Sequence, residues 1–313
     1  MLVSVVIPNY NNAKWIKQCI ESCLAQGDSY LKEVIVVDDH STDQSVELIQ
    51  QLAKTDDRVK LHINTKKGGN YARIYGYTHA TGKYIQWLDG DDLLQPGKFR
   101  SQVEVLTQTD DVDIVFSDWE MDIYKGSELI EKKLHTEAPS EDMLYDLLID
   151  KWKPVHGYLC TREIVDRVMR VKGWNPETPV AQDREFFTKA AILGAKFNYC
   201  PGNFCIYNRW SKTTVSEVEY RKRLRSNIQL EHNLWKLLET RDEIDKHRLR
   251  LYRGILDTHA LKAIFYDWKI KLLRPVRFWW VQWSLIHWKM RFVIPFIFLI
   301  KQVQYYLTGQ KDG

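Results

Sequence analysis

Residues 84–92 read Tyr-Ile-Gln-Trp-Leu-Asp-Gly-Asp-Asp, an apolar run that ends in three acids within four residues. A short apolar run bounded by a glycine-containing turn is typical of a buried β-strand. Carboxylates packed this closely repel one another, and a hard divalent cation offsets that repulsion. The stretch therefore predicts a strand over Tyr84–Leu88 whose carboxyl end carries a functional site.

Earlier apolar, β-branched runs alternate with helical patterns. We predict strands at Val3–Ile7, Val34–Val37 and Val59–Ile63, and helices at Ala13–Ala25, Ser41 to Leu52 and Tyr71–Ala80. Ser41 with Gln44 makes a capping box for the second of these helices. Continuously apolar strands separated by helices predict a parallel sheet covered on both faces, an α/β fold. In such sheets ligands bind beyond the carboxyl ends of the strands, where the polar clusters of this chain fall.

The pattern is less regular after residue 110. Predicted strands are Val112–Ser117 and Phe197–Tyr207, and predicted helices are Ser140–Ile149 and Gln182–Leu193. From Val218 to about Leu273 the sequence is dense in charge and poor in helix breakers, which indicates helices. A change of composition near residues 210–217 marks the expected boundary between two regions.

Asp89 and Asp91 are the candidate metal ligands. Oxygen ligands at this spacing suit Mg²⁺ or Mn²⁺, which can also hold phosphate oxygens. Gly90 between them permits close approach of the backbone to a ligand. A solvated acidic turn is the alternative for an isolated pair, and the buried strand before it favours the metal site.

Polar residues also follow the other strands. Asp38 and Asp39 end the second strand, where a carboxylate can bind a nucleoside or, alternatively, cap the next helix. Tyr10 can stack on a base unless it packs internally. Arg73, near a helix start, favours phosphate. The chain has no P-loop and no G-x-G-x-x-G after the first strand, which counts against an ordinary NAD-binding domain.

Three blocks together resemble the family 2 glycosyltransferases of the GT-A fold. They are V-S-V-V-I-P-N-Y-N-N from residue 3, V-I-V-V-D-D-H-S-T-D from residue 34, and residues 84–92. Their order, spacing and strand context match over residues 1–110. The resemblance implies a Rossmann-like α/β fold with a mostly parallel central sheet, a sugar-nucleotide donor that is usually UDP-linked, a divalent metal, and inversion at the anomeric carbon.

The resemblance also implies roles for individual residues at the donor. Pro8 and Tyr10 would flank the base with Asn11 beside them, Asp39 would bind the uracil, and Arg73 would lie on the base or phosphate side. Asp89 would meet the ribose or the metal, and Asp91 would be the main metal ligand.

The catalytic base of this family matches Asp183 here. Inverting transfer is a direct displacement, so a carboxylate must take the acceptor hydroxyl's proton while the metal neutralises the departing diphosphate. The family's frequent Glu-Asp pair is Gln182-Asp183 in this chain. Glu185 is the alternative base, although its position favours a helix-surface charge. The alternative for Asp183 is a helix N-terminal charge without catalytic duty.

Acceptor recognition is expected from the middle of the chain. Trp174 can stack on a sugar face and His156 can line the cleft, with packing as an equal alternative for both. Arg209, which we expect to follow the last strand, is a candidate phosphate contact. We therefore place a GT-A domain at residues 1–212, with a nucleotide-binding half at 1–110 and an acceptor half at 111–212, and a helical extension at 213–313.

The C-terminal residues differ from the rest in composition. The chain has 313 residues and a net charge of +4, yet residues 262–313 hold 9 Lys+Arg against 2 Asp+Glu, a net +7, and 5 of the 12 Trp. Mixed Trp and basic residues are typical of a segment on a membrane surface, and the apolar run here is too short to span a bilayer. We expect peripheral attachment to the cytoplasmic face and a lipid-linked or surface-polysaccharide acceptor. Packing on the enzyme or on a partner, including a homo-oligomer, is the alternative.

Composition excludes several other classes. Hydrophobic residues at 44% exclude a disordered or collagen-like chain, and the balanced charge argues against a nucleic-acid partner. Five cysteines without C-x-x-C fit buried thiols in a reducing cytosol, and no signal-peptide pattern is present. A sugar-nucleotide nucleotidyltransferase would show a Gly-rich, basic first loop instead of P-N-Y-N-N. An inactive GT-A scaffold in a membrane assembly is disfavoured by Asp39, Asp89, Asp91 and Asp183 occurring together.

Overall fold

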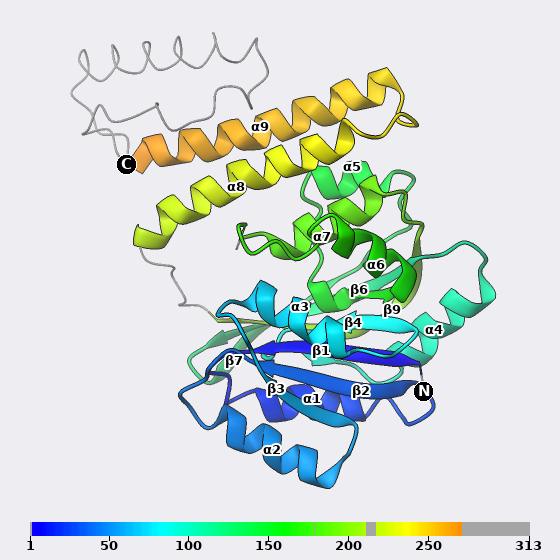
Figure 1. Ribbon diagram of the computed structural model, residues 1–313, viewed down its shortest axis with the longest axis vertical. Helices are drawn as coiled ribbons and strands as arrows, with labels where there is room; N and C mark the ends of the chain where they lie inside the picture. The colour runs from blue at the N-terminus through cyan, green and yellow to red at the C-terminus, as the bar shows by residue number, and fades with distance from the viewer. Residues whose placement is uncertain (1, 179, 211–216, 271–313) are drawn as a thin grey trace. The chain divides into compact units, whose positions relative to one another are not determined.

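The computed structural model describes residues 2–178, 180–210 and 217–270 (Figure 1). Within these ranges the strands are β1 (Val3–Asn9), β2 (Leu31–Asp38), β3 (Val59–Ile63), β4 (Tyr84–Trp87), β5 (Leu93–Leu94), β6 (Ile114–Lys125), β7 (Glu128–His135), β8 (Tyr158–Thr161) and β9 (Phe197–Trp210). The helices are α1 (Ile16–Leu24), α2 (Ser45–Thr55), α3 (Gly69–His79), α4 (Lys98–Gln108), α5 (Met143–Leu148), α6 (Arg162–Arg170), α7 (Gln182–Ile192), α8 (Glu217–Leu238) and α9 (Lys246–Ile270). A 3₁₀ turn covers Val155–Gly157.

One sheet organises the chain up to residue 210. Its strand order is β3-β2-β1-β4-β8-β6-β9-β5, and β7 pairs with β6. The four strands β3, β2, β1 and β4 are parallel, β8 runs antiparallel to both of its neighbours, and β6 and β9 are parallel. The predicted α/β fold with a parallel N-terminal half is confirmed, and the carboxyl ends of β1, β2 and β4 share one edge.

Helices cover both faces of this sheet. Alternate residues of β1 point in opposite directions, so Val5 packs with residues of α1, α2 and α4, whereas Val6 packs with residues of α3, α6 and α7. The strands β1, β2 and β4 are buried along nearly their whole length. Two apolar layers therefore fix the sheet and leave the loops at its carboxyl edge to form a site.

The predicted capping box at Ser41 and Gln44 is wrong. Helix α2 begins at Ser45, and its N-cap Gln44 makes no side-chain capping bond. Ser41 instead donates its hydroxyl to Asp38 and accepts a backbone N–H from Asn11. This exchange ties the loop after β1 to the loop after β2, which delays the helix by several residues.

The chain divides into two compact units, residues 1–219 and 220–313. In the second unit Arg253 of α9 lies 4.3 Å from the Trp235 ring of α8, so the two helices pack on each other. None of the helices in the described residues combines the length and apolar character needed to cross a membrane. The predicted membrane-surface segment at 262–313 lies outside the described residues except for its first residues in α9.

Candidate functional site

The acidic turn after β4 lies at the carboxyl edge of the sheet, as predicted. Asp89 accepts a hydrogen bond from the Arg73 guanidinium at 2.5 Å. Burial, together with the negative charge of Asp89, raises the pKa of Asp91 to about 6. A carboxylate that is costly to ionise beside another carboxylate is stabilised by a bound cation. The pair therefore fits a hard divalent ion, with Asp91 as the ligand not already paired to an arginine.

Asp92, the third acid, is a structural residue. It is 1% exposed, accepts the Asn208 backbone N–H at 2.8 Å, and lies 3.2 Å from His156 Nδ1. Burial raises the pKa of Asp92 well above its usual range and lowers that of His156 to about 3, so burial disfavours the charged form of each group. His156 is fully buried and its Nε2 bonds to the Ile206 carbonyl at 3.1 Å. The expectation that His156 contacts an acceptor is wrong, because no part of it reaches solvent.

Gly90 is required by packing. A Cβ there would lie 2.9 Å from Asn12 Nδ2 and 3.4 Å from the Pro8 carbonyl oxygen. The acidic turn therefore packs closely against the loop after β1, and a larger residue at position 90 would require the Asn12 side chain to move. Asn208 holds the same turn from the other side by donating its side-chain amide to the Asp91 carbonyl at 2.5 Å.

The two acids after β2 serve different neighbours. Asp39 is 6% exposed and accepts bonds from Asn64 Nδ2 at 2.7 Å and from the Gly68 backbone N–H at 2.8 Å. Asp38 accepts bonds from Asn9 and Ser41. Neither residue caps α2, since the N-cap is Gln44. Asp39 thus orders the loop before α3, at the edge where the donor is expected.

The loop after β1 presents an exposed aromatic ring. Tyr10 is 47% exposed, and Lys67 Nζ lies 5.2 Å from its centroid. Pro8, two residues earlier, is partly buried. Asn11 has a left-handed backbone (φ 51°), and its side-chain oxygen accepts the Thr42 backbone N–H at 2.8 Å. Tyr10 is therefore free to stack on a planar group, whereas Asn11 shapes the loop.

Arg73 joins the acidic turn to helix α7. Besides Asp89, it donates to Gln182 Oε1 at 2.8 Å and lies 4.7 Å from the centroid of the Trp174 ring. The Phe186 ring is stacked on the same indole, with the two centroids 4.6 Å apart and the ring planes at 19°. Trp174 is 1% exposed. The expected sugar stacking on Trp174 is wrong, because its ring is enclosed by protein. The Arg73 guanidinium packs over this ring.

Asp183 occupies the first turn of α7. The residue before the helix, Ala181, has a left-handed backbone (φ 50°), which turns the chain sharply into the helix. Asp183 Oδ2 accepts the Trp152 indole N–H at 2.6 Å, and Oδ1 accepts the Arg184 backbone N–H at 2.9 Å. Burial raises the pKa of Asp183, although Trp152 and the helix N–H oppose that effect.

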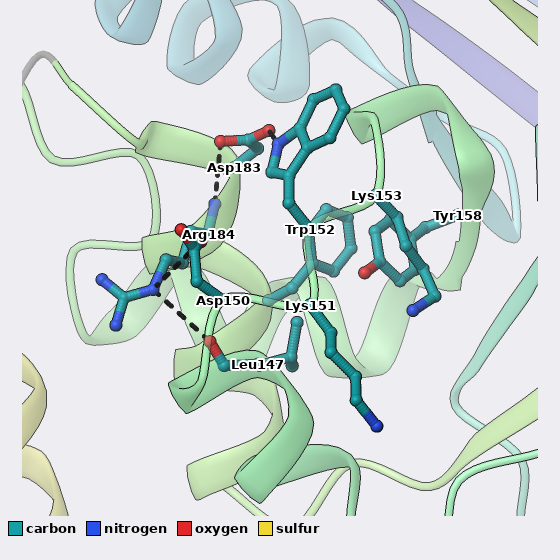
Figure 2. A pocket seen from close by; sticks show the side chains of 9 residues that line it. Leu147, Asp150, Lys151, Trp152, Lys153, Tyr158, Asp183 and Arg184 are labelled. Carbon is teal, nitrogen blue, oxygen red and sulfur yellow. Dashed lines mark hydrogen bonds and ion pairs between the residues drawn. The ribbon is translucent and has the colours of Figure 1, made fainter. Parts of the chain in front are cut away.

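A small, shallow pocket lies beside Asp183 (Figure 2). Its lining comes from α5 and the segment after it, from β8 and from α7, and consists of Leu147, Asp150, Lys151, Trp152, Lys153, Tyr158, Asp183, Arg184 and Phe187. Its walls combine aromatic and charged side chains. Asp183 is the carboxylate that this pocket presents near the Arg73 and Asp89 pair.

Glu185, the alternative base, is neither a base nor a surface charge. It is 1% exposed, pairs with Lys189 Nζ at 2.6 Å, and accepts a hydrogen bond from the Thr178 hydroxyl. Both oxygens are occupied inside the protein. The helical register that directs Asp183 to the pocket turns Glu185 into the interior.

Arg209 lies within β9 and not beyond it. It is exposed and pairs in register with Ile123 of β6. The site residues missing from the sequence prediction are Trp152 and Asn208, which contact Asp183 and the acidic turn. Both contacts link positions far apart in the chain, and neither residue belongs to a recognisable motif.

Within the described residues no group of three or more His, Cys, Asp and Glu side chains is placed to hold a metal ion. A cation at Asp89 and Asp91 would therefore share its coordination with water or with ligand oxygens, as Mg²⁺ commonly does.

Comparisons with known proteins agree with this geometry. The family model for glycosyl transferase family 2 matches residues 4–209. An uncharacterized glycosyltransferase of Nostoc sp. is 33% identical over 178 residues, which are 55% of this chain and 54% of that protein. The glycosyltransferase GlyG of Streptococcus pneumoniae is 35% identical over 119 residues, which are 38% of this chain and 39% of that protein. The chain thus spans about half or less of these relatives' length.

Solved structures show the same fold at low sequence identity. Residues 1–349 of Staphylococcus aureus TarS, in complex with UDP, match with a TM-score of 0.60 and 16% identity over 89% of this chain and 76% of that one. The mannosyltransferase PcManGT from Pyrobaculum calidifontis, in complex with GDP-Man and Mn²⁺, matches with a TM-score of 0.51 and 19% identity over 88% and 76%. The expected GT-A fold is confirmed. With its motifs in place at the carboxyl edge of the sheet and the family model matching most of its length, the chain belongs to glycosyl transferase family 2.

Proposed function

We propose that this chain is an inverting glycosyltransferase that moves a sugar from a nucleoside-diphosphate sugar, UDP-linked in the simplest case, to a hydroxyl of a glycan or lipid-linked acceptor. The observation that carries the proposal is the Arg73 bridge. This guanidinium contacts both Asp89, in the acidic turn, and Gln182, the residue before Asp183. A candidate metal ligand and a candidate base therefore lie at one edge, which is what a single displacement needs.

The donor would bind along the loops after β1 and β2. The exposed Tyr10 ring, with Pro8 and Asn11 in the same loop, offers a platform for a base, and Asp39 supplies a carboxylate next to it. Uracil offers an imide N–H to such a carboxylate. TarS was solved with UDP and PcManGT with GDP-Man, so relatives of this fold accommodate different bases. Assignment of UDP to this chain rests on the position of Asp39.

Asp91, assisted by Asp89, would hold Mn²⁺ or Mg²⁺. When bound, the ion would offset the charge of the departing diphosphate. Arg73 adds a fixed positive charge beside it and needs no reorganisation, because Trp174 and Gln182 already hold its guanidinium in place.

Asp183 would act as the general base. The acceptor hydroxyl gives its proton to the Asp183 carboxylate while its oxygen forms the new bond to the anomeric carbon. The bond from that carbon to the diphosphate oxygen breaks in the same step, and the nucleoside diphosphate leaves with the electron pair. Attack from the face opposite the leaving group inverts the anomeric centre. The pocket beside Asp183 is the proposed acceptor entrance, and exposed Arg209 remains a candidate phosphate contact.

We further propose a role in cell-surface polysaccharide or glycolipid synthesis at the cytoplasmic face of the membrane. The proposal rests on the basic, Trp-rich composition of residues 262–313. Flotation of the full-length chain with anionic liposomes tests it, and full recovery in the unbound fraction would contradict it. A homo-oligomer through the same region is the competing proposal. The family match favours glycosyl transfer over nucleotidyl transfer.

A sugar-nucleotide panel with Mn²⁺ tests the enzymatic proposal. The expected result is release of nucleoside diphosphate from one UDP-sugar, increased by a matching acceptor and lost on chelation. Asp91→Asn should lower metal-dependent turnover by at least about a hundredfold, since one transition-state charge contact is worth that much. Asp110→Asn, which makes the same chemical change at an exposed position, is the control. Equal turnover in the two variants would contradict the metal assignment.

A further inference from the structure

Trp152 lies in a tight turn that directs its indole at Asp183 (Figure 2). The turn follows α5, and Asp150 in it adopts a left-handed backbone (φ 65°). The Trp152 backbone N–H closes the turn by donating to the Asp150 carbonyl at 2.8 Å. Its indole Nε1 then lies 2.6 Å from Asp183 Oδ2. An N–H that donates to a carboxylate at this distance makes a strong hydrogen bond.

Neighbouring aromatic rings hold the indole in this orientation. Trp119 of β6 meets it edge-on at 5.2 Å and 90°, and Tyr207 of β9 meets it at 5.2 Å and 71°. Trp119 is itself stacked on His135 at 3.9 Å and donates its indole N–H to Glu137 at 3.1 Å. The Trp152 ring therefore has little room to rotate, and its hydrogen bond to Asp183 is preorganised.

Charged groups surround Asp183 on several elements. The nearest charges that act on its carboxylate are those of Asp89 and Arg73. The pocket adds Asp150, Lys151, Lys153 and Arg184. Lys151 is paired with Asp146 at 2.7 Å and Lys153 with Glu137 at 2.9 Å. With these lysines paired elsewhere, the donors bonded to the carboxylate are one neutral indole N–H and the backbone N–H of Arg184.

We propose that Trp152 is a positioning residue that fixes the orientation of the Asp183 carboxylate for proton abstraction. An indole N–H does not ionise at ordinary pH and is a donor only. It therefore orients a base without competing for the acceptor's proton. The Arg184 N–H holds Oδ1 and the indole holds Oδ2, which leaves the remaining lone pairs for the pocket. This role rests on the proposed function of Asp183 as the base.

Strand β9 connects this arrangement to the acidic turn. Tyr207 packs against Trp152, and the next residue, Asn208, bonds to the backbone of Asp91 and to the Asp92 side chain. Adjacent strand residues point to opposite sides. Tyr207 and Asn208 thus connect the partner of Asp183 to the acidic turn. A direct displacement requires the proposed base and the proposed metal ligands to stay at a fixed separation.

Indole NMR tests the hydrogen bond without any substrate. In ¹⁵N-tryptophan-labelled protein the Trp152 Nε1–H signal, assigned by its loss in Trp152→Phe, is expected far downfield. It should shift as Asp183 titrates and lose that pH dependence in Asp183→Asn. Trp235→Phe, which alters a half-buried tryptophan in the second unit, should leave the signal unchanged. A Trp152 signal that ignores both pH and Asp183→Asn would overturn the proposal.

Kinetics separate this proposal from the one on which it rests. Trp152→Phe should lower kcat about tenfold to a hundredfold with an unchanged KM for the UDP-sugar found by the panel, and should shift the acid limb of kcat to higher pH. In the Asp183→Asn background the same change should have no further effect. Full transfer by Asp183→Asn would refute the base assignment. If Asp183→Asn is inactive but Trp152→Phe keeps the wild-type kcat and pH profile, only the positioning role is refuted.

Discussion

Individual acids at the sheet edge differ in function because their surroundings differ. Asp92 and Asp38 are enclosed by hydrogen-bond donors and hold loops together. Burial, together with the charge of neighbouring Asp89, raises the pKa of Asp91 to about 6. Asp183 is directed at a pocket by two N–H groups. Residue type alone predicts none of these distinctions, since every one of these residues is an aspartate.

Glu185 provides a prediction at this scale. Replacement by glutamine leaves the buried Lys189 ammonium without its partner, so Glu185→Gln should destabilise the protein by about 3 kcal/mol. Urea denaturation measures the change in free energy of unfolding. The surviving folded fraction should retain its turnover per molecule, because neither Glu185 oxygen reaches the pocket. A stable but inactive variant would instead make Glu185 part of the catalytic apparatus.

At the scale of elements, the first three strands and β4 were predicted closely, whereas the second half was predicted only in part, with β6, α5, α7 and β9 near their expected positions. Strands β1, β2 and β4 are buried on both faces, so their sequences are almost continuously apolar and can be recognised as strands from the sequence alone. Strand β7 is exposed along nearly all of its length, and β5 contains only two residues. Such strands are defined by pairing with β6 and β9 and carry no periodic signal of their own.

Helix α4 was also absent from the prediction, and its sequence explains why. Lys98 and Gln102 are fully buried and bonded to each other at 2.7 Å, so the helix buries polar positions that a hydrophobic pattern would assign to solvent. The same limit applied to Trp152, whose importance depends on a contact with a residue 31 positions away.

Glu33 of β2 links three strands and the loop before β4, and its bonds predict the acid stability of the fold. It accepts bonds from Ser4 of β1, Lys60 of β3 and Thr81 before β4. Burial on its own would raise the pKa of Glu33, but these donors outweigh it and lower the pKa to about 2. Because the folded pKa lies below the unfolded one, the stabilisation is present above pH 4.5 and is lost as pH falls towards 2. Its size is about 3 kcal/mol.

Chemical denaturation between pH 6 and pH 2 measures this dependence. The wild type should lose that free energy of unfolding in the stated window. Glu33→Gln should be less stable at pH 6 and show a flatter profile, and Glu131→Gln, at an exposed position of β7, is the control. Identical profiles for wild type and Glu33→Gln would contradict the linkage.

For the whole molecule, the order of the motifs was the strongest predictor. Three weak blocks separated by strand–helix units predicted the GT-A fold because the sheet brings their carboxyl ends to one edge. The acceptor side could not be predicted in the same way. Trp174 and His156 are polar or aromatic residues in loops by sequence, yet the structure buries both. Their exposure depends on how α7 and β9 pack, which no local pattern encodes.

The central proposal is that Asp183 removes the acceptor's proton while Asp91 and the metal serve the donor. The most direct measurement compares donor binding with transfer in Asp183→Asn. Isothermal titration with UDP and Mn²⁺ should give a Kd within about threefold of the wild type, whereas sugar transfer to the acceptor should fall by at least about a hundredfold. Transfer at the wild-type rate, or loss of UDP binding in parallel with activity, would contradict the claim.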